Sequence, residues 1–269
     1  MFPELFRIPS LELAVSTYSA ALAIAFITTL TLAIRLAKRE GLPEDRVRRF
    51  GIYLLPIALL GVRILDVLIM WPSADGSWYR WLSANVIHSG GQYLGGFLAA
   101  LGASMILARA WQLSWPQMAD VFAPGLALGN VIGRLGCFAG GCCWGQPTTS
   151  WMGVQFSERA QEINGVPANV ALLPTQLIEA SANLAIFVFL LGLWKRKAFN
   201  GQIILVHMIL YSLERFIVEF WRADPRGQIM GFSTAQSISV IILPLSFLSY
   251  CWLGKRMTRN SAVSDSCGV

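Results

Sequence analysis

Long runs of apolar residues are the feature that most restricts what this chain can fold into. Seven runs, each close to the length of a membrane span, alternate with short polar breaks. About 20 apolar residues in a helix cross the roughly 30 Å of hydrocarbon in a bilayer. The sequence therefore predicts an all-α, polytopic membrane protein with seven transmembrane helices. The runs are Leu13–Ile34, Phe50–Met70, Gln92–Ala110, Met118–Phe138, Ala171–Trp194, Gly201–Trp221 and Phe232–Leu253.

Composition supports a membrane protein over a soluble one. Charged residues make up 13% of the 269, whereas a soluble domain carries about 25%. The net charge of +6 could indicate nucleic-acid binding, but basic cytoplasmic loops explain it better. We therefore expect the membrane, and no nucleic acid, as a partner. We expect a single transmembrane domain over 1–269, with a small external segment at about 139–170. Residues 1–12 lack a basic n-region, so we expect no removable signal peptide.

Lysine and arginine are divided unequally between the two sets of alternating loops. One set holds 13 of the 21 basic residues, the other holds five, and three lie inside the predicted spans. Cytoplasmic loops carry the excess of basic residues in membrane proteins. The pattern predicts an external amino terminus, a cytoplasmic carboxyl terminus and a location in the bacterial inner (cytoplasmic) membrane.

Ionisable residues inside these spans gather near one side of the bilayer. Each charged group within a span costs about 2.5–3.5 kcal/mol, so it needs a partner or a function. Structural ion pairs are one explanation, since Arg63 and Asp66 are three residues apart on one helical face. We favour a shared, water-reachable cavity with an excess of arginines, whose planar forks match phosphate oxygens. Asp120 and His207 are exceptions that lie nearer the cytoplasmic side. The predicted outer-leaflet group is Tyr18, Arg63, Asp66, His88, Arg134, Glu179, Arg215, Glu219 and Arg222.

Two glycine-rich segments fall at the same predicted depth. HSGGQYLGG begins at His88, and GNVIGRLGCFAGGCCWGQPT begins at Gly129. Glycines allow close backbone approach to a ligand and expose amide donors to an anion; helix packing through small residues is the alternative. His88 is either an incidental surface histidine or a catalytic one.

The second glycine-rich segment holds Cys137, Cys142 and Cys143. In order of preference, these cysteines pack as small apolar residues, form an external disulfide, or act as reactive thiols. Cys137 with either neighbour is a better disulfide than the adjacent pair. The cysteines are not paired as CxxC with a second CxxC or an HxxxH, which argues against a structural zinc site.

These segments, taken in order, resemble the prolipoprotein diacylglyceryl transferase family over almost the whole chain. The matching elements are STYSAALA, AKREGLPEDRV leading to LLGVR, the paired glycines of the third span, GRLGCF, PTQLIEA and ERFIVEFWR. The resemblance implies a transferase that moves the diacylglyceryl unit of phosphatidylglycerol to the lipobox cysteine thiol of a pre-lipoprotein and releases glycerol phosphate. It implies no metal and no cofactor.

The resemblance also assigns expected roles. Arg134 and Arg215 match family arginines around the lipid headgroup, Glu219 matches a family carboxylate, and Tyr18 matches a family tyrosine near the site. Expected catalytic residues are His88, Arg134, Arg215 and Glu219, with His88 the first choice of general base. Expected substrate-binding residues are Tyr18, Arg63, Gly90, Gly91, Gly95, Gly96, Gly133, Gly136, Cys137, Cys142, Gly145, Gln176, Glu179 and Arg222.

The chain departs from the main family pattern after its Gly-Arg-x-Gly element. Where the family has Asn, Asn and Glu, this chain has Cys137, Gly140 and Cys142, and it has Leu94 where many members carry His. It resembles a cysteine-bearing branch of the family. A transferase with a different acceptor therefore stays open as an alternative. A non-catalytic phospholipid-binding or transport protein is another, although no internal repeat supports transport.

Overall fold

The computed structural model describes residues 2–8, 13–70, 93–224, 228–229 and 231–266. The chain divides into two compact units, which are Met1–Ala33 with Ala119–Val269, and Ile34–Met118. Predicted site residues His88, Gly90 and Gly91 lie outside the described residues.

The smaller unit contains two packed helices, α2 (Glu44–Met70) and α4 (Tyr93–Ala110). Small residues let them approach closely, because a Cβ added at Gly95 would lie 2.3 Å from the carbonyl oxygen of Gly61. A Cβ at Gly96 would meet Val62 at 2.7 Å. Such close backbone approach through glycine is typical of membrane helix pairs.

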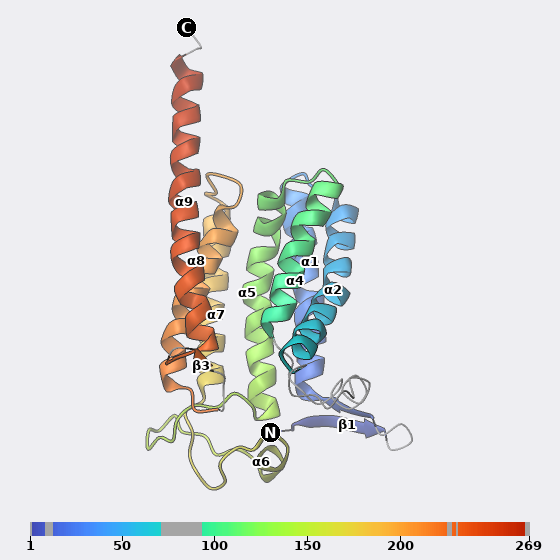
Figure 1. The fold of residues 1–269 in the computed structure, drawn as a ribbon, viewed down its shortest axis with the longest axis vertical. Helices are drawn as coiled ribbons and strands as arrows, with labels where there is room; N and C mark the ends of the chain where they lie inside the picture. Colours follow the sequence, from blue (N-terminus) through green and yellow to red (C-terminus); the bar gives the residue numbers. More distant parts are fainter. Residues whose placement is uncertain (1, 9–12, 71–92, 225–227, 230, 267–269) are drawn as a thin grey trace. The chain divides into compact units, whose positions relative to one another are not determined.

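The larger unit contains most of α1 (Thr17–Arg39) and α5 (Trp115–Gly140), together with α7 (Thr175–Trp194), α8 (Gln202–Val218) and α9 (Thr234–Ser266). Helices α7, α8 and α9 run side by side (Figure 1). Side chains of α5, α7 and α8 share one buried apolar cluster, which includes Ala127, Leu190 and Ile203. These contacts join α5, α7 and α8 at the end of α7 that lies away from Glu179.

Helix ends in this unit are capped by specific side chains. Ser233 Oγ accepts a hydrogen bond from the Gln236 amide at 3.1 Å, and Gln236 Oε1 accepts from the Ser233 amide at 3.1 Å. This reciprocal capping box starts α9. Helix α8 begins after Gly201, whose φ of +96° suits glycine. The free amides at that end donate to Asp120 from α5, at 2.7 Å from Gly201 and 3.0 Å from Ile204. Asp120 therefore has a structural role there.

The segment between α5 and α7 folds around a small core of its own. It contains α6 (Glu158–Asn164) and isolated β-bridges that join Leu172 to Pro147 and Val154. Phe156 and Leu172 are buried together with Trp144, Ala160 and Val166. This segment is the one predicted as external at about 139–170.

Each of the seven predicted spans coincides with a helix in the described part of the chain. Four stretches, in α1, α5, α7 and α9, are long and apolar enough to cross a membrane. Helix α4 contributes a shorter apolar helix, Gly95–Ala110. The chain is therefore a largely helical membrane protein, and the count of seven spans stays a prediction.

The first predicted span starts too early, and two short β-ribbons accompany the helices. Leu13–Ser16 form strand β2, which pairs antiparallel with β1 (Glu4–Ile8). Helix α1 starts only at Thr17, where Ser16 Oγ accepts the Ser19 amide at 3.0 Å. An apolar run alone does not distinguish a strand from the first turn of a helix. A second small ribbon joins β3 (Gln228–Ile229) to β4 (Phe232–Ser233).

Candidate active site

Glu179 is the centre of a buried ion-pair network in the larger unit. It lies in the second turn of α7 and is fully buried. Its Oε1 accepts a hydrogen bond from Arg222 Nη1 at 2.7 Å. Its Oε2 lies 2.7 Å from Arg134 Nη2 and 3.6 Å from Arg215 Nη1. One carboxylate thus gathers arginines from α5, α8 and the segment after η3 (Glu219–Trp221).

The three arginines differ in how fully protein partners occupy them. Arg222 uses Nη1 for Glu179 and binds both oxygens of Asp224 through Nε and Nη2, at 3.0 and 3.1 Å. Arg215 Nη2 lies 3.0 Å from Glu219, four residues along. Within the described part of the chain, Arg134 has its ion pair with Glu179 alone, and it is the most exposed of the three at 17%. Of the three guanidinium groups, that of Arg134 is therefore the most available to bind an anion.

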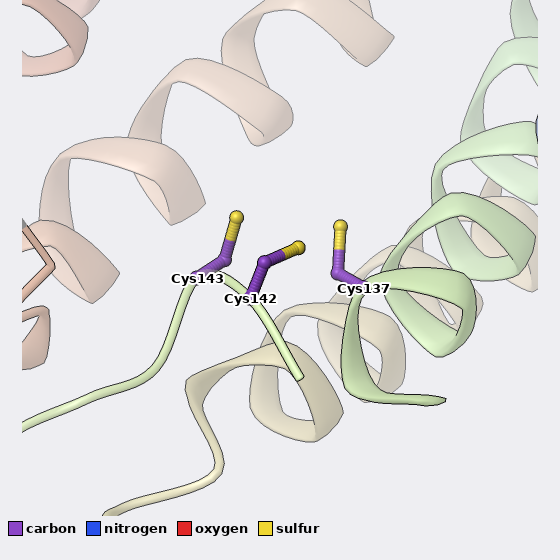
Figure 2. A group of neighbouring side chains, drawn as sticks. All are labelled: Cys137, Cys142 and Cys143. Carbon is purple, nitrogen blue, oxygen red and sulfur yellow. The ribbon is translucent and has the colours of Figure 1, made fainter. Parts of the chain in front are cut away.

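The three sulfur atoms of Cys137, Cys142 and Cys143 lie next to this network, all within 4.8 Å of one another. Cys137 is buried at the end of α5, and the other two belong to the following loop (Figure 2). Hydrogen bonds from Cys137 and Cys142 lower the pKa of Cys143, and the charges of Arg222 and Arg134 lower it further. Hydrogen bonding to Cys137 and Cys143, together with burial, raises the pKa of Cys142. Of the three thiols, Cys143 is therefore the one whose thiolate form its surroundings favour.

The cysteine loop is fixed by the amino-terminal turn of α7. Gln176 Nε2 donates to the Cys142 carbonyl at 2.7 Å, and Thr175 Oγ1 donates to the Cys143 carbonyl at 2.9 Å. Gly145 follows, closely surrounded by other backbone atoms, and its amide donates to the Leu173 carbonyl at 3.0 Å. These bonds place the thiols beside the start of the helix that carries Glu179.

Glu214 is a second buried carboxyl group in the same region. It lies on α8, and neither of its carboxylate oxygens has a hydrogen-bond partner. It interacts electrostatically with Glu179, Arg215, Arg134 and Arg222. Burial of an unpartnered carboxyl group is costly, so Glu214 is a candidate site residue that the sequence did not single out.

Many of the predicted site residues come together here. Gln176 and the Glu179 network form one group with the thiols. Tyr18 of α1 joins them through electrostatic interaction with Cys137 and Arg134. The brought-together set is Tyr18, Arg134, Cys137, Cys142, Gln176, Glu179, Arg215, Glu219 and Arg222.

Other predicted site residues lie outside this group, and several of them are glycines at contacts between helices. Gly95 and Gly96 lie in the α2–α4 contact of the other compact unit, which also contains Arg63. A Cβ at Gly136 would lie 2.4 Å from Ala21, whereas one at Gly133 would meet nothing within 4 Å. Of these positions, Gly133 keeps the open surroundings that a ligand contact needs, and the predicted lipid-binding roles of all of them stay predictions.

The predicted excess of arginine is not found among the described site residues. Three acids, Glu179, Glu219 and Asp224, pair with the three arginines, and Glu214 is a fourth acid that interacts with them electrostatically. Glu179 and Glu219 were recognised from the sequence. Asp224 was missed, although its place two residues after Arg222 was a usable signal, and Glu214 was missed although it precedes Arg215.

Comparison with known proteins reveals the relatives of the chain. Residues 3–252 match the family profile described as prolipoprotein diacylglyceryl transferase. The chain is 33% identical over 241 residues to phosphatidylglycerol–prolipoprotein diacylglyceryl transferase 2 of Clostridium perfringens, covering 88% of this chain and 91% of the relative. It is 32% identical to the phosphatidylglycerol–prolipoprotein diacylglyceryl transferase of Oceanobacillus iheyensis, covering 92% and 87%. The protein of that name from Acaryochloris marina is also 32% identical, covering 93% and 90%.

Proposed function

The chain belongs to the prolipoprotein diacylglyceryl transferase family, and on that premise we propose that it transfers the diacylglyceryl group of phosphatidylglycerol to a lipobox cysteine thiol. The acceptor is a pre-lipoprotein, and glycerol phosphate is released. The convergence of Arg134 and Arg215 on Glu179 carries this proposal. Guanidinium groups beside a partly open position suit a lipid phosphate.

Each arginine has a distinct part in the proposed site. Arg134 binds the phosphate through the nitrogens that Glu179 does not occupy. Arg215 supports the same charge, and Glu219 holds its guanidinium in place. Arg222 is fully engaged by Glu179 and Asp224, so it orients the Glu179 carboxylate and does not bind lipid.

The reaction is a nucleophilic displacement at the glycerol carbon that bears the phosphate. The acceptor sulfur attacks that carbon while the carbon–oxygen bond to phosphate breaks. Negative charge grows on the leaving phosphate, and fixed cationic donors stabilise it. Tyr18 borders the site and contacts substrate. His88 is proposed as the general base that takes the thiol proton.

The proposed arrangement in the membrane follows the charge of the loops. Seven helices span the inner membrane, with the amino terminus outside and the carboxyl terminus in the cytoplasm. The Glu179 network then lies toward the outer leaflet, where a secreted pre-lipoprotein arrives. All basic residues of the Lys195–Lys197 turn fall at the opposite end of α7 from Glu179, which agrees with the rule that positive loops are cytoplasmic.

A transfer assay tests the proposal. Purified protein is incubated with acyl-labelled phosphatidylglycerol and a lipobox peptide, and the peptide is analysed by mass spectrometry. We expect one diacylglyceryl unit on the peptide, and none on a peptide whose cysteine is replaced by serine. Arg134→Ala should remove the product. Arg159→Ala, which changes a half-exposed arginine paired with Glu4 and Glu162, should leave it unchanged. A stable protein that gives no modified peptide would contradict the proposal.

A different acceptor is the second candidate, because the chain departs from its family at Cys137, Gly140 and Cys142. The structure places two of these three positions in the thiol cluster beside the arginines. The same assay with amine and hydroxyl acceptors decides between the two. Diacylglyceryl transfer to one of these, with the lipobox peptide unmodified, would favour the second candidate.

A further inference from the structure

The three-thiol cluster is held together by the backbone at the end of α5. The Cys142 amide donates to the Cys137 carbonyl at 3.0 Å, and the Gly141 amide donates to the Phe138 carbonyl at 3.2 Å. With Gly141 at φ +72°, these bonds form the Schellman motif that ends many helices. That motif brings the side chains five positions apart into contact, so Cys137 and Cys142 meet as a consequence of the fold.

The third thiol arrives through an uncommon backbone conformation. Cys143 has φ +67°, a left-handed conformation that costs a residue with a Cβ about 1–2 kcal/mol. Hydrogen bonds from Gln176 and Thr175 to the carbonyls of Cys142 and Cys143 hold the loop in this form. Figure 2 shows the three side chains on one side of the loop, with Cys142 pointing toward Cys137. A disulfide would use only two of these thiols.

The electrostatic setting suits several negative sulfurs. Arg134 precedes Cys137 by three residues on α5, which places both on the same helical face. Arg222 also interacts electrostatically with Cys143. Two guanidinium groups can thus offset the charge of a thiolate group bound to a metal ion.

We propose that Cys137, Cys142 and Cys143 bind a thiophilic d10 metal ion, with zinc the intended occupant, and that the fourth coordination position receives the acceptor cysteine thiol. The second half of this inference rests on the proposed function. Zinc–sulfur bonds of about 2.3 Å put tetrahedral sulfurs about 3.8 Å apart. Sulfurs already within 4.8 Å of one another need to approach by about 1 Å at most. Zinc sites with three protein ligands keep the fourth position for substrate.

Metal coordination would activate the acceptor thiol. A coordinated thiol loses its proton more readily, so the general base of the proposed function needs to be only weak when it takes that proton. The electron pair of the resulting thiolate forms the bond to the glycerol carbon of the lipid. The carbon–oxygen bond breaks, its electron pair leaves with glycerol phosphate, and the thioether product leaves the metal. The neighbouring Arg134 binds the phosphate as it departs.

Metal titration of the full-length protein tests the site without relying on activity. Detergent-purified protein is reduced, freed of metal with a chelator and titrated with Cd²⁺, whose thiolate complexes absorb in the ultraviolet, and with Zn²⁺ against a chromophoric chelator. We expect one ion per chain and a higher melting temperature with zinc. Replacing Cys137, Cys142 or Cys143 by serine should weaken metal binding by at least about tenfold to a hundredfold. Even the loss of a residue that only hydrogen-bonds to a metal ligand lowers metal affinity by that factor.

Cys251→Ser is the matched control, because Cys251 lies on α9 outside the cluster. It should leave the stoichiometry and affinity unchanged. Absence of saturable binding to wild-type protein would overturn the metal site, as would binding that survives all three cluster substitutions. A wild-type mass two hydrogens lower, with a disulfide between two of these cysteines, would overturn it too.

Transfer assays with metal-free and zinc-loaded protein test the acceptor role separately. Zinc-dependent modification of the lipobox peptide supports it. Equal transfer by metal-free protein overturns the acceptor role. No transfer in either state, with one zinc still bound per chain, contradicts the proposed function and supports the metal site alone.

Discussion

Nη1 of Arg222 lies 2.7 Å from Oε1 of Glu179, and each side chain is only 1% exposed. Because Oε2 of the same carboxylate faces Arg134 and Arg215, Glu179 neutralises charge contributed by several elements at once. A buried ion pair that loses one partner leaves an uncompensated charge. This relationship makes Glu179 the residue on which the geometry of the arginines depends.

Glu179→Gln should therefore destabilise the protein strongly. The amide keeps the shape but removes the charge, and breaking a buried pair costs about 3–5 kcal/mol. Chemical unfolding in detergent, followed by tryptophan fluorescence, measures the free energy of unfolding. Glu162→Gln is the control, since its pair with Arg159 is largely exposed and should change stability far less. Equal stability of the two variants would mean that the buried network is not the structural centre described above.

Arg134→Ala should act on catalysis more than on folding. Arg134 is 17% exposed, and Glu179 keeps its pairs with Arg222 and Arg215 when Arg134 is absent. Loss of one preorganised donor to a developing charge costs about 10²–10³ in kcat. Arg134→Lys should recover part of that loss, because an ammonium lacks the bidentate fork. Transfer rates and melting temperatures measured on the same samples check this. Lost membrane expression with a normal rate per folded molecule would give Arg134 a purely structural role.

Much of the fold was predictable because apolar runs and polar breaks are local signals. Helix α7 begins at Thr175, four residues after the predicted start at Ala171, and both end at Trp194. The β1–β2 ribbon was missed, since Leu13–Ser16 are apolar and strand pairing with residues 4–8 is not visible in a single run.

The candidate site was predictable as a set of residues but not as a geometry. Depth in the membrane placed Arg134, Glu179 and Arg215 together, which the structure supports for these three. Which carboxylate holds which guanidinium depends on the rotation of α5, α7 and α8, and helical spacing does not determine it. The meeting of Cys137 and Cys142 was expected as a disulfide option. The third thiol required the left-handed backbone of Cys143.

Gly145→Ala should disturb the connection between the cysteine loop and the arginine network. The new Cβ would lie 2.7 Å from the Leu173 carbonyl oxygen and 2.8 Å from that of Trp221. Backbone atoms on two sides leave no room for a methyl group, so we expect a lower melting temperature and reduced activity. Gly140→Ala is the matched control, because nothing lies within 4 Å of its Cβ position. Equal melting temperatures and activities of the two variants would contradict the close backbone packing around Gly145.

Topology reporters test the predicted orientation directly. A reporter fused after Val269 should give a cytoplasmic signal, and one inserted between Gln155 and Asn169 should give an external signal. The reason is the distribution of lysine and arginine, which favours the cytoplasm for the loops richest in them. Signals from the same side at both positions would make the seven-span count wrong.

Asp120 should prove essential for stability and irrelevant to the chemical step. Its carboxylate is fully buried and accepts the Gly201 and Ile204 amides at the start of α8, with Lys197 Nζ 3.7 Å away. Asp120→Asn keeps one acceptor and turns an amide N–H toward a backbone donor, so a buried donor loses its partner at a cost of about 1–3 kcal/mol. Asp120→Ala loses both bonds and the favourable charge at a helix amino terminus, so it should unfold at a lower denaturant concentration than Asp120→Asn.

Glu44→Gln, which changes a more exposed acid in the first turn of α2, controls for general charge loss. Transfer per folded molecule should stay within about twofold of the parent in all three variants. A twofold change in rate corresponds to only about 0.4 kcal/mol in the activation free energy. A large loss of turnover in folded Asp120→Asn would give this residue a part in the reaction that its position at the far end of α5 from Arg134 does not predict.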